Sequence, residues 1–164
     1  MALTPTLTMS APGIDQFSST QLLQTARLFA SDPELHTLID PDEDTSRWIE
    51  IDSSPHHQIW LLSWPTGTEN GWHDHGESAS AFQVLRGTLL EQTSNEHRRE
   101  FRTIVAGEGR SFEPNQIHHL SNVRTGTALS VHVYAPQLTT TTRYAITPTG
   151  LQSGAAAANA ELDW

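Results

Sequence analysis

Residues 67–87 read GTENGWHDHGESASAFQVLRG, with one histidine on each side of Asp74 directly before an apolar run. The run ASAFQVLR has the length and composition of a buried strand. In an extended chain, side chains two residues apart share a face, so His73 and His75 can direct ring nitrogens to the same ion, at about 2.1 Å from each. The spacing predicts a metal site at the beginning of this strand.

Two later segments carry the other candidate residues. Residues 114–119, PNQIHH, offer a third imidazole, and only one of His118 and His119 can join the first pair because neighbours in a strand point to opposite faces. Residues 130–134, SVHVY, place Ser130, His132 and Tyr134 on one face of a predicted strand. This use of histidine is typical of a metalloenzyme.

The composition excludes several other kinds of chemistry. The 164 residues correspond to one ordinary domain, and cysteine is absent, which excludes disulfides, thiolate zinc sites and cysteine nucleophiles. All nine basic residues are arginine, so no lysine can form a Schiff base. The net charge of −10 argues against nucleic acids and anionic membranes as partners. Any metal must therefore be held by histidine or carboxylate.

The chain divides into a central domain and two terminal segments. Residues 1–14, rich in Thr, Pro and Ser, are expected to be disordered, residues 15–146 to form one domain, and the Ala-rich tail 147–164 to be weakly ordered. The first residues lack the pattern of a signal peptide, and no apolar stretch approaches the ~20 residues needed to span a bilayer. We expect a cytoplasmic protein.

Short apolar or alternating runs follow one another from Arg47 onward and predict about eight strands, among them 57–64, 79–86, 88–93, 99–105, 120–123 and 128–134. Glycines such as Gly67 and Gly87 separate the runs where the chain must turn. A helix is expected at 21–29, with Ser18 or Ser19 as its N-cap, and a second short helical segment at 33–39. The fold class is therefore mostly β, a jelly roll or small barrel with one or two short N-terminal helices.

The spacing of these residues resembles the two sequence motifs of the cupin superfamily. The first motif matches at Gly67, His73-x-His75 and Gly87, and the second at Pro114, His118 and Asn122. This resemblance implies a cupin jelly-roll barrel and favours His118 over His119 as the third ligand, because the asparagine lies four residues after His118. At the place of the usual carboxylate ligand the chain has Ser80, and Glu77 is expected to be an exposed loop acid.

Residues 40–145 further resemble the cysteine dioxygenase family, with the most specific matches at WLLSW (60–64), GWHDHGESA (71–79), FQVLRGTL (82–89) and SVHVYAP (130–136). The resemblance implies that His73, His75 and His118 bind Fe(II) and leave three coordination positions open. It also implies a Ser130–His132–Tyr134 relay, with Tyr134 reaching the bound substrate and oxygen. The expected activity is oxidation of L-cysteine by O2 to cysteine sulfinic acid.

Two positions bear on the substrate and on the branch of the family. Arg47 lies 26 residues before His73, a spacing similar to that of the arginine with which the family grips the substrate carboxylate. Members that crosslink a cysteine to the active-site tyrosine carry that cysteine at the place of Ser80. Because this chain has no cysteine, it resembles the bacterial branch.

Several alternatives stay open at this point. The substrate could be 3-mercaptopropionate or cysteamine, and Arg47 could instead be an exposed arginine paired with Asp44 or Glu50. The protein could be a non-catalytic cupin that binds a metal or small ligand, or an isomerase or hydrolase with zinc or manganese, because imidazole binds these metals as well as iron. Residues 130, 132 and 134 could be buried polar groups satisfied by backbone. A monomer or weak oligomer is expected.

Overall fold

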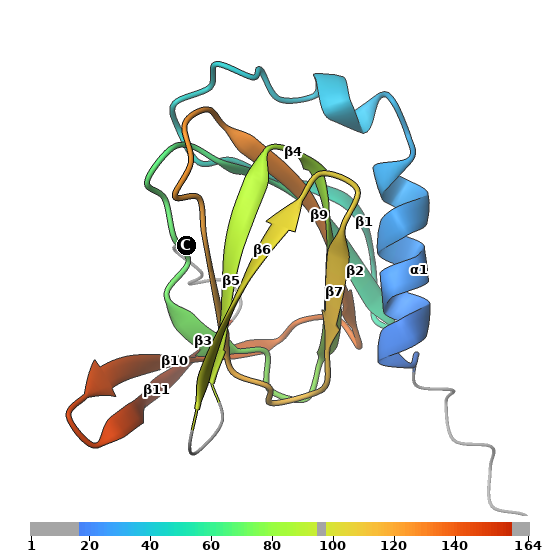
Figure 1. Ribbon diagram of the computed structural model, residues 1–164. Coiled ribbons are helices and arrows are strands. Elements are labelled where there is room, and N and C mark those ends of the chain that lie inside the picture. The colour runs from blue at the N-terminus through green and yellow to red at the C-terminus, as the bar shows by residue number, and fades with distance from the viewer. Residues whose placement is uncertain (1–16, 95–97, 159–164) are drawn as a thin grey trace, which may run out of the picture.

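The computed structural model describes residues 17–94 and 98–158, which form one α-helix and two antiparallel sheets (Figure 1). Helix α1, Ser19–Ala30, begins after Ser18, whose hydroxyl accepts a hydrogen bond from Gln21 N while the Gln21 side chain accepts one from Ser18 N. This reciprocal capping satisfies two of the free N–H groups at the helix start. A 3-10 turn, Leu35–Thr37, follows the helix.

The strands are divided between a five-stranded and a six-stranded sheet, and every pairing is antiparallel. The first has the order β1 (Trp48–Ser54), β2 (His57–Trp64), β9 (Ala128–Ala135), β4 (Ala79–Arg86), β7 (Gly109–Phe112). The second has the order β11 (Gly150–Ala158), β10 (Thr140–Thr147), β3 (Trp72–Asp74), β8 (His118–Ser121), β5 (Thr88–Ser94), β6 (Arg99–Val105). The fold class predicted from the sequence is confirmed, in the form of a two-sheet jelly roll and not a closed barrel.

Two hydrophobic cores lie on opposite faces of the five-stranded sheet. One is packed under α1, which contacts β4, β9 and β7, and includes Leu22, Ala26 and Val131. The other fills the space between the two sheets and includes Phe82, Leu89 and Phe112. Strand β9 is buried along its whole length because it has a core on each side. Its odd-numbered residues face the helix, and its even-numbered residues face the interior of the jelly roll.

The turn between β4 and β5 requires glycine. Gly87 has a φ of 77°, in the left-handed region that glycine enters without strain. A Cβ at this position would lie 2.9 Å from the Cα of Ala128. The turn therefore depends on glycine for its conformation and for the close approach of β9.

The structure departs from the sequence predictions in several places, and Thr140–Thr147 form β10, a strand that was not predicted. Gly150–Ala158 form β11 on the edge of the six-stranded sheet, where a weakly ordered tail was expected. The strand predicted at 120–123 is His118–Ser121, and β7 was not predicted. The tail prediction overlooked that an alanine-rich segment can pair through its backbone with the Thr-rich β10. The predicted disorder of residues 1–14 lies outside the described residues, and the domain boundaries stay a prediction.

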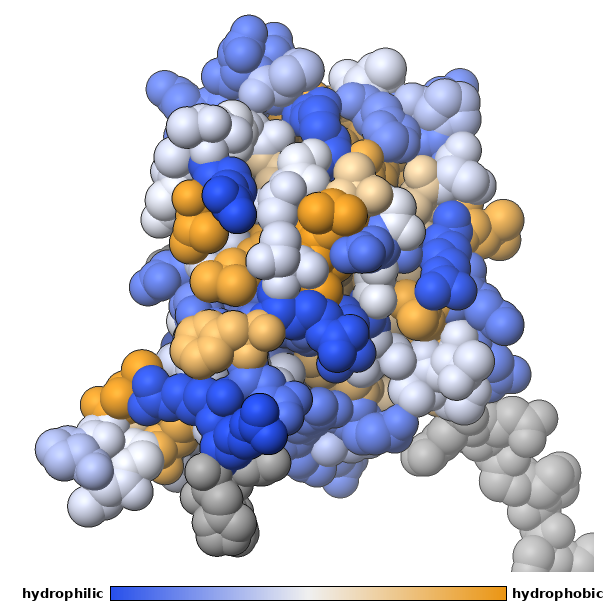
Figure 2. Space-filling model, in the orientation of Figure 1, coloured by the Kyte–Doolittle hydropathy of each residue, from blue (hydrophilic) through white to orange (hydrophobic). Residues whose placement is uncertain are grey.

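The surface in the view of Figure 1 is mainly hydrophilic, and its apolar parts are small and separate, one of them on the hairpin of β10 and β11 that projects from the body (Figures 1 and 2). Exposed apolar residues scattered in this way are normal for a folded protein. Within the described part of the chain, no helix is long and apolar enough to span a bilayer.

Candidate metal centre

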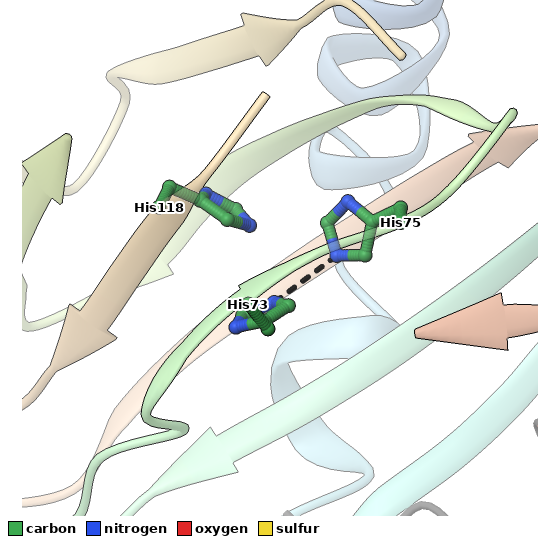
Figure 3. A group of neighbouring side chains, drawn as sticks. All are labelled: His73, His75 and His118. Atoms are coloured by element: carbon green, nitrogen blue, oxygen red, sulfur yellow. Dashed lines mark hydrogen bonds between the residues drawn. The ribbon is translucent and has the colours of Figure 1, made fainter. Parts of the chain in front are cut away.

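Three histidine side chains meet between the two sheets. His73 lies on β3, His75 directly follows that strand, and His118 begins β8, which pairs with β3 so that His73 is directly opposite His118. Figure 3 shows the three rings turned toward one another, with a dashed line between the His73 and His75 nitrogens. These two Nε2 atoms are 3.1 Å apart, and one nitrogen from each of the three rings lies within 4.8 Å of the others.

The separation suits one ion bound on one face of an octahedron. Two ligand atoms at right angles, each about 2.1 Å from a metal, are about 3.0 Å apart. All three histidines are buried. The residues present therefore fit a metal ion held by three imidazoles.

Hydrogen bonds set which nitrogen two of the rings can offer. His73 Nδ1 lies 2.9 Å from the Gly71 carbonyl oxygen, which can only accept, so Nδ1 carries the proton and Nε2 is the nitrogen that can bind a metal. His75 Nδ1 lies 3.1 Å from Ser80 Oγ, and with Nε2 bound to a metal the Nδ1–H donates to this hydroxyl. These partners at Nδ1 orient each ring so that its Nε2 faces the other histidines.

His118 differs from the other two histidines. Both of its ring nitrogens are buried, and no hydrogen-bond partner for either is found among the described residues. A buried polar atom without a partner is costly and needs an explanation. A metal ion that binds one of these nitrogens would be the missing partner of that nitrogen.

Burial keeps the three rings neutral. It lowers the pKa of His73 to about 4, although the hydrogen bond to Gly71 acts in the opposite direction. It lowers the pKa values of His75 and His118 well below the usual value, and the neighbouring imidazoles lower both further. Since a metal binds the unprotonated nitrogen, the site is ready to bind at neutral pH.

The three-histidine group contains no carboxylate among the residues that the structure describes. Ser80, at the position of the usual cupin carboxylate, contacts His75 instead, and Glu77 is exposed. His119 points to the opposite side of β8 from His118, where its ring nitrogens contact Gln92 and Glu69. The ligands thus add no negative charge to the ion.

The Ser130, His132 and Tyr134 side chains face the same interior space. Ser130 Oγ accepts a hydrogen bond from Trp64 Nε1 at 2.8 Å and lies 2.9 Å from His132 Nε2. Because burial lowers the pKa of His132 to about 3, the ring is neutral and the serine hydroxyl is free to donate to Nε2. The His132 and Tyr134 rings are stacked, with their centroids 6.4 Å apart.

Tyr134 connects this group to the metal site. Its ring lies edge-on to His75, with a centroid separation of 4.9 Å. Burial raises the pKa of its hydroxyl above the usual value, so the group keeps its proton and can donate a hydrogen bond. Two phenylalanines complete the apolar wall, since Phe112 lies 4.1 Å from His118 and Phe82 lies 5.3 Å from His132 between ring centroids.

Arg47 is not brought to the three histidines. Its side chain is 59% exposed, and its guanidinium is 2.9 Å from the Glu43 carboxylate. The next residue, Trp48, pairs with Leu62 of the interior core, so alternation turns Arg47 toward the other face of the sheet. Its role as a carboxylate anchor stays a prediction.

Sequence reasoning did not identify Trp64 or Ser80 as supports of the site. The tryptophan lies in the quoted motif WLLSW, but only the pairing of β2 with β9 reveals that it reaches Ser130. Asn122, which the second motif drew attention to, has a structural role. Its side chain amide donates to the carbonyl oxygens of Trp64 and Gly126 and so ties two loops together.

Comparison with known proteins agrees with this geometry. Residues 19–146 match the cysteine dioxygenase type I family. Among solved structures, the fold is similar to TT1209 from Thermus thermophilus (TM-score 0.55, 19% identity, covering 63% of this chain and 94% of that one). It is also similar to a conserved protein with a double-stranded β-helix domain from Klebsiella pneumoniae (TM-score 0.54, 16% identity, covering 74% of this chain and 94% of that one). A third similar structure is oxalate oxidase in complex with glycolate (TM-score 0.53, 18% identity, covering 66% of this chain and 60% of that one).

The structural neighbours establish only the cupin fold, because their sequence identities are low. The family match is more specific and covers most of the chain. It includes the three histidines of the candidate metal centre and the strand that carries Ser130, His132 and Tyr134. On this ground, the chain belongs to the cysteine dioxygenase type I family.

Proposed function

We propose that this protein is an Fe(II)-dependent thiol dioxygenase that oxidises L-cysteine with O2 to cysteine sulfinic acid, adding both oxygen atoms to the sulfur. The observation that carries the proposal is the buried group of three neutral imidazoles, which lies beside a protonated tyrosine in a chain of this family. Iron held by His73, His75 and His118 would supply adjacent positions for the thiolate and O2 and pass electrons between them.

The chain's own residues prepare the surroundings of that reaction. The wall of Phe82, Phe112 and buried strand residues excludes water. Trp64 and Ser130 fix the His132 ring, and the Tyr134 hydroxyl is available to donate a hydrogen bond to the substrate or to oxygen. Three uncharged ligands would leave the charge of a ferrous ion unneutralised, and an anionic thiolate would neutralise part of it.

Replacing the third ligand tests the metal site. His118→Ala should lose both bound iron and thiol-dependent O2 consumption, because two imidazoles bind iron too weakly to retain it. Iron content after anaerobic reconstitution and an oxygen-electrode assay measure the two effects. His119→Ala is the matched control, since the neighbouring ring lies on the opposite face of β8 and should be dispensable. Turnover retained by His118→Ala would refute this ligand.

For L-cysteine we propose that Arg47 leaves Glu43 and binds the substrate carboxylate. A guanidinium–carboxylate contact contributes about 1.5–3 kcal/mol. Arg47→Ala should therefore raise KM for L-cysteine and 3-mercaptopropionate roughly tenfold or more and leave KM for cysteamine, which has no carboxylate, unchanged. Steady-state kinetics on the three thiols measure this, and an equal change on all three would exclude the role.

Cysteamine is the second candidate substrate. It is favoured by the ion pair of the exposed Arg47 side chain with Glu43, which alternation along the strand directs away from the three histidines. If the arginine keeps this position during turnover, a carboxylate on the substrate does not increase its affinity through Arg47. The rates of the wild-type protein on L-cysteine and cysteamine distinguish the two substrates.

A further inference from the structure

Gln58 lies on the same face of the five-stranded sheet as Tyr134. It is 3% exposed and pairs with Tyr134 across β2 and β9, while Trp60, two residues later, pairs with His132. Residues directly opposite in an antiparallel sheet have Cβ atoms about 5 Å apart on the same face. Ser80 pairs with Tyr134 from the other side, so Tyr134 lies between Gln58 and the serine that contacts His75.

The orientation of the Gln58 amide is fixed by Glu50. Gln58 Nε2 donates a hydrogen bond to Glu50 Oε2 at 2.9 Å. Because an ionised carboxylate can only accept, the NH2 group must face Glu50, and the carbonyl oxygen is the other branch of the planar amide. That oxygen, Oε1, is buried and has no hydrogen-bond partner among the described residues. Most buried polar atoms have one.

The surroundings of Oε1 favour a donor from the substrate. The carbonyl oxygen and the Glu50 carboxylate behind it make this part of the wall negative, so an N–H group is attracted and a carboxylate is repelled. L-cysteine and cysteamine both carry an amine two carbons from the sulfur, and 3-mercaptopropionate carries none. The amine is therefore the substrate group that this wall can distinguish.

We propose that Gln58 is a specificity-determining residue whose Oε1 accepts a hydrogen bond from the amine of the substrate. The pocket thereby favours aminothiols over thiols that have only a carboxylate. This inference rests on the proposed thiol dioxygenase function and extends it to the substrate group that is recognised. Glu50 acts as a positioning residue, because its carboxylate fixes which branch of the amide is the acceptor.

The test uses Gln58→Leu, which keeps the size of the side chain and removes both polar atoms. In the Fe(II)-loaded protein, KM for L-cysteine and cysteamine should rise about five- to tenfold, the range of one hydrogen bond, while KM for 3-mercaptopropionate changes less than about twofold. Dissociation constants of the three thiols, measured without O2, should show the same pattern independently of turnover. An equal change for all three thiols, or none, would overturn the role of Gln58.

Gln83→Leu is the matched control. Gln83 is 4% exposed and its Oε1 also has no partner among the described residues, but it pairs with Val131 on the face of the sheet that packs under α1. This substitution should leave the ratios among the thiols unchanged. A selective effect of Gln83→Leu equal to that of Gln58→Leu would contradict the proposal.

A second variant covers the case in which Gln58→Leu does not fold. Glu50 is exposed, so Glu50→Ala has little effect on packing and frees the amide to turn. It should produce the same selective rise in KM, about two- to threefold, and its absence would count against the proposal. If the wild-type protein oxidises none of the three thiols, the proposed function fails, whereas unchanged thiol binding by the variants refutes Gln58 alone.

Discussion

At the scale of single residues, Ser80 takes a role that the sequence does not reveal. In a carboxylate-containing cupin site this position would supply a charged ligand, whereas here a hydroxyl accepts a hydrogen bond from the back of His75. The serine also pairs with Tyr134 across β4 and β9. A single small side chain thus supports a metal ligand and lies beside the tyrosine.

Removing this hydroxyl should weaken the metal site without unfolding the protein. Ser80→Ala leaves His75 Nδ1 without its partner, and loss of such a support typically lowers metal affinity ten- to a hundredfold. We expect the dissociation constant for Fe(II) to rise by at least about tenfold, as measured by anaerobic titration. Ser78→Ala is the control, because Ser78 is similarly buried but its hydroxyl contacts the Gln137 carbonyl. Equal affinities of Ser80→Ala and wild type would show that His75 does not need this bond.

The sequence predicted the candidate ligands but not how the site is supported. The spacing of His73 and His75 follows from strand alternation alone, and the structure brings both to His118. The contacts of Ser80, Trp64 and Gln58 depend on which strands lie side by side, and this register cannot be read from one sequence. The side chain of Arg47 contacts Glu43 in the structure, and its spacing from His73 along the chain does not predict this ion pair.

At the scale of the elements, the β4–β5 turn sets how β9 lies against its neighbour. Gly87 and Gly107 both have a positive φ, 77° and 90°. They differ in their surroundings, because a Cβ on Gly87 would meet Ala128 at 2.9 Å, while a Cβ on Gly107 would meet nothing within 4 Å. An alanine at Gly107 would therefore add only backbone strain, whereas an alanine at Gly87 would add both backbone strain and a steric clash.

Alanine substitutions at these two turns should have different costs. Gly107→Ala is expected to lower the free energy of unfolding by about 1 kcal/mol, the cost of a left-handed conformation. Gly87→Ala adds the displacement of β9 and should lower it by about 2–4 kcal/mol. Urea unfolding of the two variants measures the difference. Equal losses would mean that the close approach to β9 contributes nothing.

The elements themselves were predicted unevenly. The runs 57–64, 79–86 and 99–105 were placed correctly because alternating or continuous apolar residues mark a strand directly. Strands β7, β10 and β11 were missed. Strand β7 is only four residues long, β10 begins with three threonines, and β11 ends in a run of alanines without alternation. Their pairing comes from backbone hydrogen bonds with neighbours that the local pattern does not reveal.

At the scale of the whole molecule, the buried histidines couple stability to pH. The pKa of His73 is lowered to about 4 and that of His132 to about 3, and those of His75 and His118 are also lowered, in each case mainly by burial. In the unfolded chain these groups titrate near 6.5. Between these values the unfolded state binds more protons than the folded state, so acid favours unfolding.

The free energy of unfolding of the metal-free protein should therefore fall as the pH is lowered from about 6.5 toward 4. Each additional proton on the unfolded chain contributes about 1.4 kcal/mol per pH unit. Urea unfolding at several pH values measures the slope. His132→Phe removes one of the four groups and should make the slope shallower, whereas a flat profile in the wild type would mean that the rings are not held neutral by burial.

Strand β9 has a consequence for how this protein can evolve. Its residues alternate between the packing beneath α1 and the polar groups beside the three histidines, so Val131 and Val133 are each one peptide unit from His132. A larger side chain beneath the helix would push the strand sideways and displace His132 and Tyr134 with it. Selection for a new substrate should consequently spare β9 and should change positions on β1, the edge strand of the sheet, in which no residue is fully buried.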